Sequence, residues 1–329
     1  MAIQEVDQQV KPIMPKSLIA PRRLTHSNYF VADWNKSMDF YTNVVGLNEA
    51  YRRPPLKAGF ICNGNTHHDV AVMEFSTRYW PEKDADHIGL FHVAFEMEHD
   101  VSLCLWYDRA VEHDVNFTVI EDHGNTHSTY MYDPDGNQIE VYVDTLKEWW
   151  RLKHGTFYWQ NPDWRPWTPW PDTERNVVEE PEFTRVDDAV FHPLKTTAGT
   201  FVTRDWDAMY FFYTEVVGLQ PLAGGPESDW AVLAGTLGER TLGLFRDKGG
   251  LTPGFHHVSM CMPDEAELDA SKARARDAGI DLIVDIDHPT RRSLGIHDLD
   301  GNLLHFYHDR DGAKVDWASV TAEQALYLV

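Results

Sequence analysis

Three residues in the first half of the chain are of the types that bind transition metals: His26, His92 and Glu140. Each falls in a segment that alternates like a strand, and each is on the polar side of its alternation. Two imidazoles and one carboxylate on one face of a metal leave the opposite coordination positions open. This ligand set suits non-haem Fe(II) and its oxygen chemistry, so the sequence predicts one shared metal site.

The strand that carries Glu140 belongs to a hairpin that the chain contains twice. The stretch YDPDGNQIEVYVD at 132–144 returns as HDLDGNLLHFYHD at 297–309, with His305 in place of Glu140. Both copies share Asp-x-Asp-Gly-Asn, in which Asp and Asn favour turn geometry and Gly supplies a positive φ. The turn is therefore interpreted as a requirement of the fold, and Glu140 as a requirement of function.

Longer repeats surround the hairpins. LTHSNYFVADWNKSMDFYTNVVGL at 24–47 returns as TTAGTFVTRDWDAMYFFYTEVVGL at 196–219, and FHVAFEM at 91–97 returns as HHVSMCM from His256. The chain thus contains four units in the order 1, 2, 1′, 2′, and each is predicted to form a strand, a helix and several more strands. We expect an α+β fold of four βαβββ units that pair into two domains.

The second copy of the candidate site is incomplete. The repeats pair the metal-competent residues with these positions of the second half: His26 with Ala198, His92 with His257, and Glu140 with His305. Because it lacks the carboxylate and one histidine, the second half is predicted to be a structural partner of a catalytic first half. His256 and His308 flank the paired positions and are predicted to point to the opposite strand face.

Length and composition set further limits. The chain has 329 residues and a formal net charge of −23, which argues against partners such as nucleic acids or anionic membranes. No apolar run approaches the ~18 residues of a membrane span, and the N-terminus lacks the apolar core of a signal peptide. The 3 cysteines are far apart, as in a reduced cytoplasmic protein. The predicted organisation has five segments: an N-terminal arm (1–21), a catalytic, metal-binding N-terminal domain (22–147), a linker rich in Trp and Pro (148–190), a structural C-terminal domain (191–312) and a C-terminal tail that ends in a short helix (313–329).

At the level of fold, nearly the whole chain resembles the vicinal oxygen chelate superfamily, and its first half resembles type I extradiol ring-cleaving catechol dioxygenases. The stretch HHDVAVMEF resembles a family strand whose histidine lies beside the O2 site, which implies that role for His68, with His67 as the alternative. DHGNTHSTYMYDPDGNQIE resembles a stretch in which His-Gly precedes a tyrosine ten residues before the ligand glutamate. Tyr130 fits that tyrosine and His123 fits the histidine, with His127 as the alternative.

The resemblance has further implications for fold and chemistry. It implies that each domain is a curled mixed sheet around a cup-shaped cavity. It implies Fe(II) at the metal-competent triad, where Mn(II) can substitute, and a catecholic substrate whose ring is cleaved with O2. It also implies His68, His123 and Tyr130 as catalytic residues, and a homo-oligomer. In the dioxygenases of this family the second half is the active one, so the arrangement here is inverted.

Two other functions remain open. By alternation, Glu74 shares the strand face of His68, and MEFSTRYW resembles the stretch that supplies a carboxylate ligand in glyoxalase I-like members. With Glu74 as a fourth ligand, the site would suit Ni, Zn or Co and proton transfer beside a carbonyl, as in a lyase, isomerase or epimerase. The third hypothesis is a non-catalytic small-molecule-binding protein of the same fold, which needs no metal triad.

Overall fold

The computed structural model describes residue 11 and residues 19–75, 88–147, 161–178 and 181–329. Most of the predicted N-terminal arm and residues 148–160 of the predicted linker lie outside this range. The first half contains these elements: β1 (Arg23–Val31), α1 (Trp34–Phe40), β2 (Asn48–Arg53), β3 (Ala58–Cys62), β4 (Val70–Glu74), β5 (Gly89–Glu96), α2 (Asp100–Glu112), β6 (Phe117–Asp122), β7 (Thr126–Tyr132) and β8 (Gln138–Asp144). The second half contains these: β9 (Lys195–Thr203), α3 (Trp206–Phe211), β10 (Gln220–Gly224), β11 (Trp230–Ala234), β12 (Arg240–Arg246), β13 (Gly254–Cys261), α4 (Glu265–Asp277), β14 (Val284–His288), β15 (Arg291–His297), β16 (Leu303–Asp309) and α5 (Ala322–Ala325).

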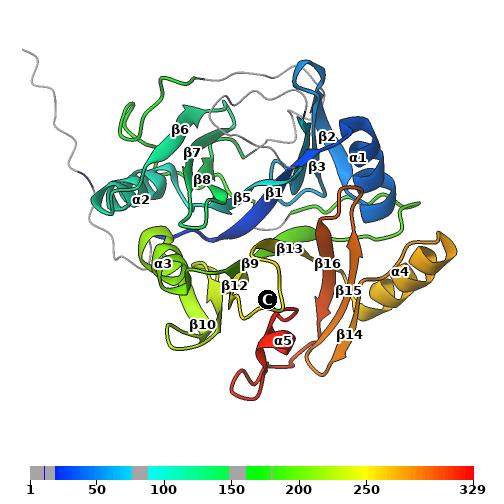
Figure 1. The fold of residues 1–329 in the computed structure, drawn as a ribbon. Coiled ribbons are helices and arrows are strands. Elements are labelled where there is room, and N and C mark those ends of the chain that lie inside the picture. The colour runs from blue at the N-terminus through cyan, green and yellow to red at the C-terminus, as the bar shows by residue number, and fades with distance from the viewer. Residues whose placement is uncertain (1–10, 12–18, 76–87, 148–160, 179–180) are drawn as a thin grey trace, which may run out of the picture.

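The strands form two mixed sheets of eight strands, one from each half of the chain (Figure 1). The first sheet has the order β2-β3-β4-β1-β5-β8-β7-β6, and the second has the order β10-β11-β12-β9-β13-β16-β15-β14. In each sheet the two units meet edge to edge through their first strands, which pair antiparallel as β1 with β5 and as β9 with β13. The α+β fold of four paired βαβββ units, predicted from the repeats, is confirmed.

The repeated helix motif is explained by its two ends. Asp33 caps α1 by accepting a hydrogen bond from the backbone N–H of Lys36, and Asp205 caps α3 in the same way. The last turn of the motif ends at Gly46, with a φ of 86°, and a Cβ there would lie 2.0 Å from the backbone oxygen of Phe191. The shared Asp-Trp and Val-Val-Gly-Leu sequences therefore begin and end this helical segment.

Within the described ranges, no helix is both long enough and apolar enough to cross a lipid bilayer.

Two β-bulges in the β1–β5 pair interrupt the alternation. Leu24 pairs with Phe95 and His26 with Ala94, which leaves Thr25 as an extra residue on β1. A second irregularity leaves Phe91 as the extra residue on β5, immediately before His92. The rings of Phe91 and His92 have centroids 4.6 Å apart, so two consecutive side chains lie on one face of the sheet. The bulges thus bring additional side chains to the face that carries the metal-competent residues.

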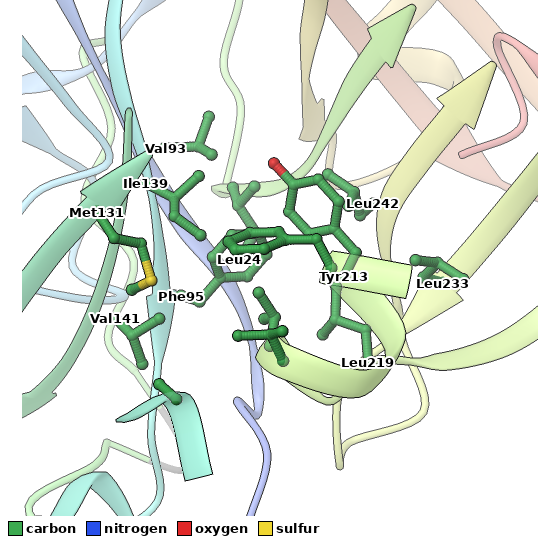
Figure 2. Close-up of a cluster of buried hydrophobic side chains, with 14 of the residues drawn as sticks. Leu24, Val93, Phe95, Met131, Ile139, Val141, Tyr213, Leu219, Leu233 and Leu242 are labelled. Atoms are coloured by element: carbon green, nitrogen blue, oxygen red, sulfur yellow. The ribbon is translucent and has the colours of Figure 1, made fainter. Parts of the chain in front are cut away.

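Two buried apolar cores span both halves. The first joins side chains of the two halves (Figure 2): Leu24, Val93, Phe95, Met131, Ile139 and Val141 from the first half, with Tyr213, Leu219, Leu233 and Leu242 from the second. The second core joins Tyr29, Met38 and Val70 of the first half to Val258, Leu268 and Phe306 of the second. Because burial of apolar surface is the main favourable term in folding, each half depends on the other for a large part of its stability.

Each of the two copies of the Asp-x-Asp-Gly-Asn turn also contacts the opposite half. The hydroxyl of Tyr41 donates a hydrogen bond to Asp298 Oδ2 at 2.9 Å, and that of Tyr213 donates to Asp133 Oδ2 at 2.9 Å. The same carboxylates accept hydrogen bonds from the asparagine of their own turn, at 2.8 Å in both copies. Burial raises the pKa of Asp133 to about 6, and hydrogen bonds from Asn137 and Tyr213 limit the rise. The repeated turn therefore closes its hairpin and binds the two halves together.

Tyr213→Phe removes one of these two reciprocal hydrogen bonds. We expect it to lower the free energy of unfolding by about 1.5–3 kcal/mol at pH 8, where Asp133 is an ionised acceptor. The loss should be smaller at pH 5, because the raised folded-state pKa of Asp133 leaves its carboxyl protonated there and a neutral carboxyl is the weaker acceptor. Urea unfolding at the two pH values measures the difference. Tyr210→Phe, at a partly exposed tyrosine of α3, is the control, and an equal loss at both pH values would contradict the expectation.

Candidate metal centre

The structure brings the three metal-competent residues together on adjacent strands. His26 is on β1, His92 on β5 and Glu140 on β8, and their candidate ligand atoms all lie within 4.8 Å of one another. Glu140 Oε2 is 3.0 Å from His26 Nε2 and 3.2 Å from His92 Nε2. Ala94 is the cross-strand partner of both His26 and Glu140, and its short side chain leaves the space that the two ligands share. These three residues can hold a metal from one side.

Burial sets the protonation states that a metal needs. It lowers the pKa of His26 to about 4, although the nearby Glu140 opposes this effect. Burial alone would raise the pKa of Glu140, but hydrogen bonds from His26 and His92 outweigh it and hold that pKa well below its usual range. At neutral pH the site therefore offers an unprotonated imidazole at His26 and a carboxylate at Glu140. This donor set fits Fe(II) or a similar divalent ion.

Asn28 connects the triad to His68, and the sequence reasoning had not singled it out. Its Nδ2 lies 3.0 Å from His92 Nε2, and its Oδ1 accepts a hydrogen bond from His68 Nε2 at 3.1 Å. Asn28 is two residues after His26 on β1 and so shares its face. The alternation that selected His26 could have found it.

His68 and His67 both lie beside His26. The ring centroids are 4.0 Å apart for His68 and His26, and 5.3 Å apart for His67 and His26. His67 Nδ1 is 3.0 Å from Asp144 Oδ1, whereas His68 is hydrogen-bonded to Asn28. Of the two alternatives, His68 is therefore the one linked to the triad, and His67 is linked to a carboxylate at the end of β8.

Tyr130 on β7 and His123, which directly follows β6, extend the site. The hydroxyl of Tyr130 donates to Glu140 Oε1 at 2.9 Å, and His123 Nε2 is 3.2 Å from the same hydroxyl. Burial, and then the charge of Glu140, raise the pKa of Tyr130 well above its usual value, so the side chain stays a phenol. Burial also lowers the pKa of His123 to about 4.

His127, the alternative to His123, has a different environment. Its Nδ1 is 2.8 Å from Asp100 Oδ1, and its ring stacks on Trp164 with centroids 4.1 Å apart. Trp164 belongs to the tryptophan-rich linker. His127 therefore fastens the linker to the first half, and His123 is the histidine that contacts Tyr130.

Glu74 is not brought to the triad. It pairs with Val31, at the far end of β1 from His26, and accepts a hydrogen bond from the ammonium group of Lys57. The position on β4 that corresponds to Glu140 on β8 is instead Ala71. The four-ligand hypothesis was thus wrong about the face: Val31 and the alternate residues of β4 pack in the second core, so Glu74 lies on the face opposite to the triad.

The corresponding face of the second half is filled by the chain's own tail. Tyr327 stacks on His257 with ring centroids 5.5 Å apart. Val329 packs against Gly243, where an added Cβ would lie only 2.6 Å from the Val329 side chain. Among the described residues, every group of three or more side chains that could hold a metal lies in the first half. The prediction that His256 points to the opposite face is wrong: a bulge makes it an extra residue before His257, and their Nδ1 atoms are 2.7 Å apart.

The fold and the site can now be compared with known proteins. Residues 23–141 and 194–306, more than half of the chain, match the family described as the Glyoxalase/Bleomycin resistance protein/Dioxygenase superfamily. The chain belongs to this superfamily.

The chain is also similar to individual proteins of known sequence and structure. The chain is 30% identical over 127 residues to biphenyl-2,3-diol 1,2-dioxygenase 3 of Rhodococcus globerulus, which covers 38% of this chain and 64% of that protein. It is 27% identical over 130 residues to catechol-2,3-dioxygenase of Bacillus subtilis, covering 39% of this chain and 44% of that protein. The matches thus span less than two thirds of either relative. The crystal structure of the 2,3-dioxygenase LapB from Pseudomonas sp. KL28 shares the fold, with a TM-score of 0.64 at 14% identity over 90% of this chain and 96% of that one.

Removing a ligand should abolish metal binding. We expect the wild-type protein, loaded anaerobically with Fe(II) and desalted, to retain about one metal ion per chain, and His26→Gln or Glu140→Gln to retain almost none. The effect should exceed the about 10- to 100-fold that loss of an outer partner costs. Metal analysis by atomic emission measures it, and Glu74→Gln is the control that keeps its metal. Loss of metal in that control would restore the four-ligand site.

Proposed function

We propose that the protein is a non-haem Fe(II)-dependent extradiol dioxygenase. It would cleave the ring of a catechol-type substrate with O2 and incorporate both oxygen atoms. The observation that carries the proposal is the three-residue ligand set, with Ala71 at the position where a fourth protein ligand would lie. Fe(II) held by this triad would supply open coordination positions for the two oxygens of a catechol and for O2, and Mn(II) accepts the same ligands.

The relatives support this choice within the superfamily. The two matched proteins are named for dioxygenases that act on catechol-type compounds. The glyoxalase-like alternative needs Glu74 as a fourth metal ligand, but the Glu74 carboxylate instead accepts a hydrogen bond from Lys57. A non-catalytic binding protein would not need two histidines and a glutamate converging within 4.8 Å in a buried site.

His68 is suited to hold a proton. Its Nε2 donates to Asn28 Oδ1, so in the neutral ring the lone pair is on Nδ1. That nitrogen is buried and has no hydrogen-bond partner among the residues that the structure describes. His68 would accept a proton at Nδ1 from one hydroxyl of the catechol and later return it to the ring-opened product.

Tyr130 positions the carboxylate of Glu140. As a phenol it donates to Glu140 Oε1, which fixes the carboxylate against the two imidazoles. Its hydroxyl also lies 3.2 Å from His123 Nε2. Tyr130 and His123 would then face the second oxygen of the substrate.

The test of this function is ring cleavage by the reconstituted protein. After anaerobic loading with Fe(II) and addition of substituted catechols, admission of air should give a yellow ring-opened product with one O2 consumed per product. Glu140→Ala and His26→Ala should give none, and His68→Gln should lower kcat by about 100-fold or more because it removes a proton-transfer group.

The second half supplies a matched control. His305→Ala removes a buried histidine at the position that corresponds to Glu140, and it should leave the cleavage rate unchanged. Absence of O2 uptake with every catechol tested, in a protein that retains its iron, would refute the proposed function.

A further inference from the structure

Glu121 is a buried carboxylate to which the proposed function assigns no role. It lies on β6 with an exposed fraction of 4%, and its cross-strand partner is Ser128 on β7. Its Oε1 is 3.3 Å from Nε2 of His123, which in turn is 3.2 Å from the hydroxyl of Tyr130. Glu121, His123, Tyr130 and Glu140 thus form a continuous chain of polar contacts that ends at the candidate metal ligand.

The two oxygens near His123 Nε2 show which ring nitrogen carries the hydrogen. The hydroxyl of Tyr130 has one hydrogen and donates it to the carboxylate of Glu140, so toward His123 its oxygen can only accept. The carboxylate of Glu121 can also only accept. Both neighbours of His123 Nε2 therefore require that this nitrogen carry the hydrogen, which leaves the lone pair of the neutral ring on Nδ1.

The charges around His123 fall into two groups. Glu140 favours its protonated form, and Arg53, His67 and His92 disfavour it, while burial lowers its pKa most of all. The carboxylate of Glu121 lies 3.3 Å from His123 Nε2 and also raises the pKa of Tyr130. A carboxylate at this distance is the group that can balance a positive charge on a buried imidazole.

We propose that Glu121 is a positioning residue that fixes His123 with its hydrogen on Nε2 and balances the charge that His123 gains when Nδ1 accepts a proton. The proton comes from the second ring hydroxyl of the substrate, so this inference rests on the proposed function. In the step, the substrate O–H bond breaks and an N–H bond forms at Nδ1. The oxygen keeps the electron pair, and the imidazolium is paired with Glu121.

Proton counting on substrate binding tests the proposal without turnover. Calorimetry of anaerobic catechol binding to the Fe(II)-loaded protein, in buffers with different ionisation enthalpies, gives the number of protons released to solvent. The wild-type protein should retain the second proton on His123. Glu121→Gln, which keeps the shape and removes the charge, should release about one proton more per site.

Kinetics provide the second measurement. Glu121→Gln should lower kcat by about 10- to 100-fold with little change in KM, and Glu121→Asp should recover part of the rate because it restores the charge. The iron content of both Glu121 variants should equal that of the wild-type protein, since Glu121 is not a ligand. Glu112→Gln, on the exposed end of α2, is the matched control and should behave as wild type in both measurements.

The outcomes separate the two proposals. If the wild-type protein cleaves catechols while Glu121→Gln has unchanged proton release and kcat, the part assigned to Glu121 is wrong and the function stands. If Glu121→Asp is as slow as Glu121→Gln and proton release is the same in both variants and the wild type, the carboxylate serves packing alone. If the wild-type protein neither binds nor cleaves any catechol, the function fails and this inference fails with it.

Discussion

The antiparallel pairing of β1 with β5 is the constraint on which the site depends. His26 belongs to the first unit, whereas His92 and Glu140 belong to the second, so none of the units contains the triad by itself. The edge-to-edge pairing places Ala94 between His26 and Glu140, and the two bulges of the pair turn Thr25 and Phe91 to the same face. A shift of register by one residue would move the ligands to the opposite face of the sheet.

Much of this arrangement could be predicted from the sequence because it is periodic. The repeats identified the four units, and alternation placed His26, His92 and Glu140 on one face. The bulges could not be predicted, since an extra residue in a strand leaves no signature in composition, and His256 was therefore assigned to the wrong face. Glu74 was also assigned to the wrong face, because His68, from which the alternation was counted, precedes β4 and is not part of its alternation. The hydrogen bonds of Asn28 and the contact of Glu121 with His123 depend on side-chain positions that alternation alone does not give.

The two halves divide the chemistry and the stability unequally. The first half holds the triad, while the corresponding face of the second half is occupied by Tyr327 and Val329. Both cores, however, take side chains from both halves, so the half without a metal site buries apolar surface for the other. The histidines that remain at His257 and His305 pack against an aromatic ring of the tail and need no metal to explain them.

The paired contacts of Tyr41 with Asp298 and of Tyr213 with Asp133 have the geometry of an isologous interface, in which residue i of one copy meets residue j of the other and the reverse also holds. The chain is thus equivalent to a two-fold dimer whose subunits have been fused. In a dimer of identical chains, every substitution would change both sites at once. Fusion removes that restriction: the residues of the interface must stay alike in the two copies, while the ligand positions can diverge, as Glu140 and His305 have done.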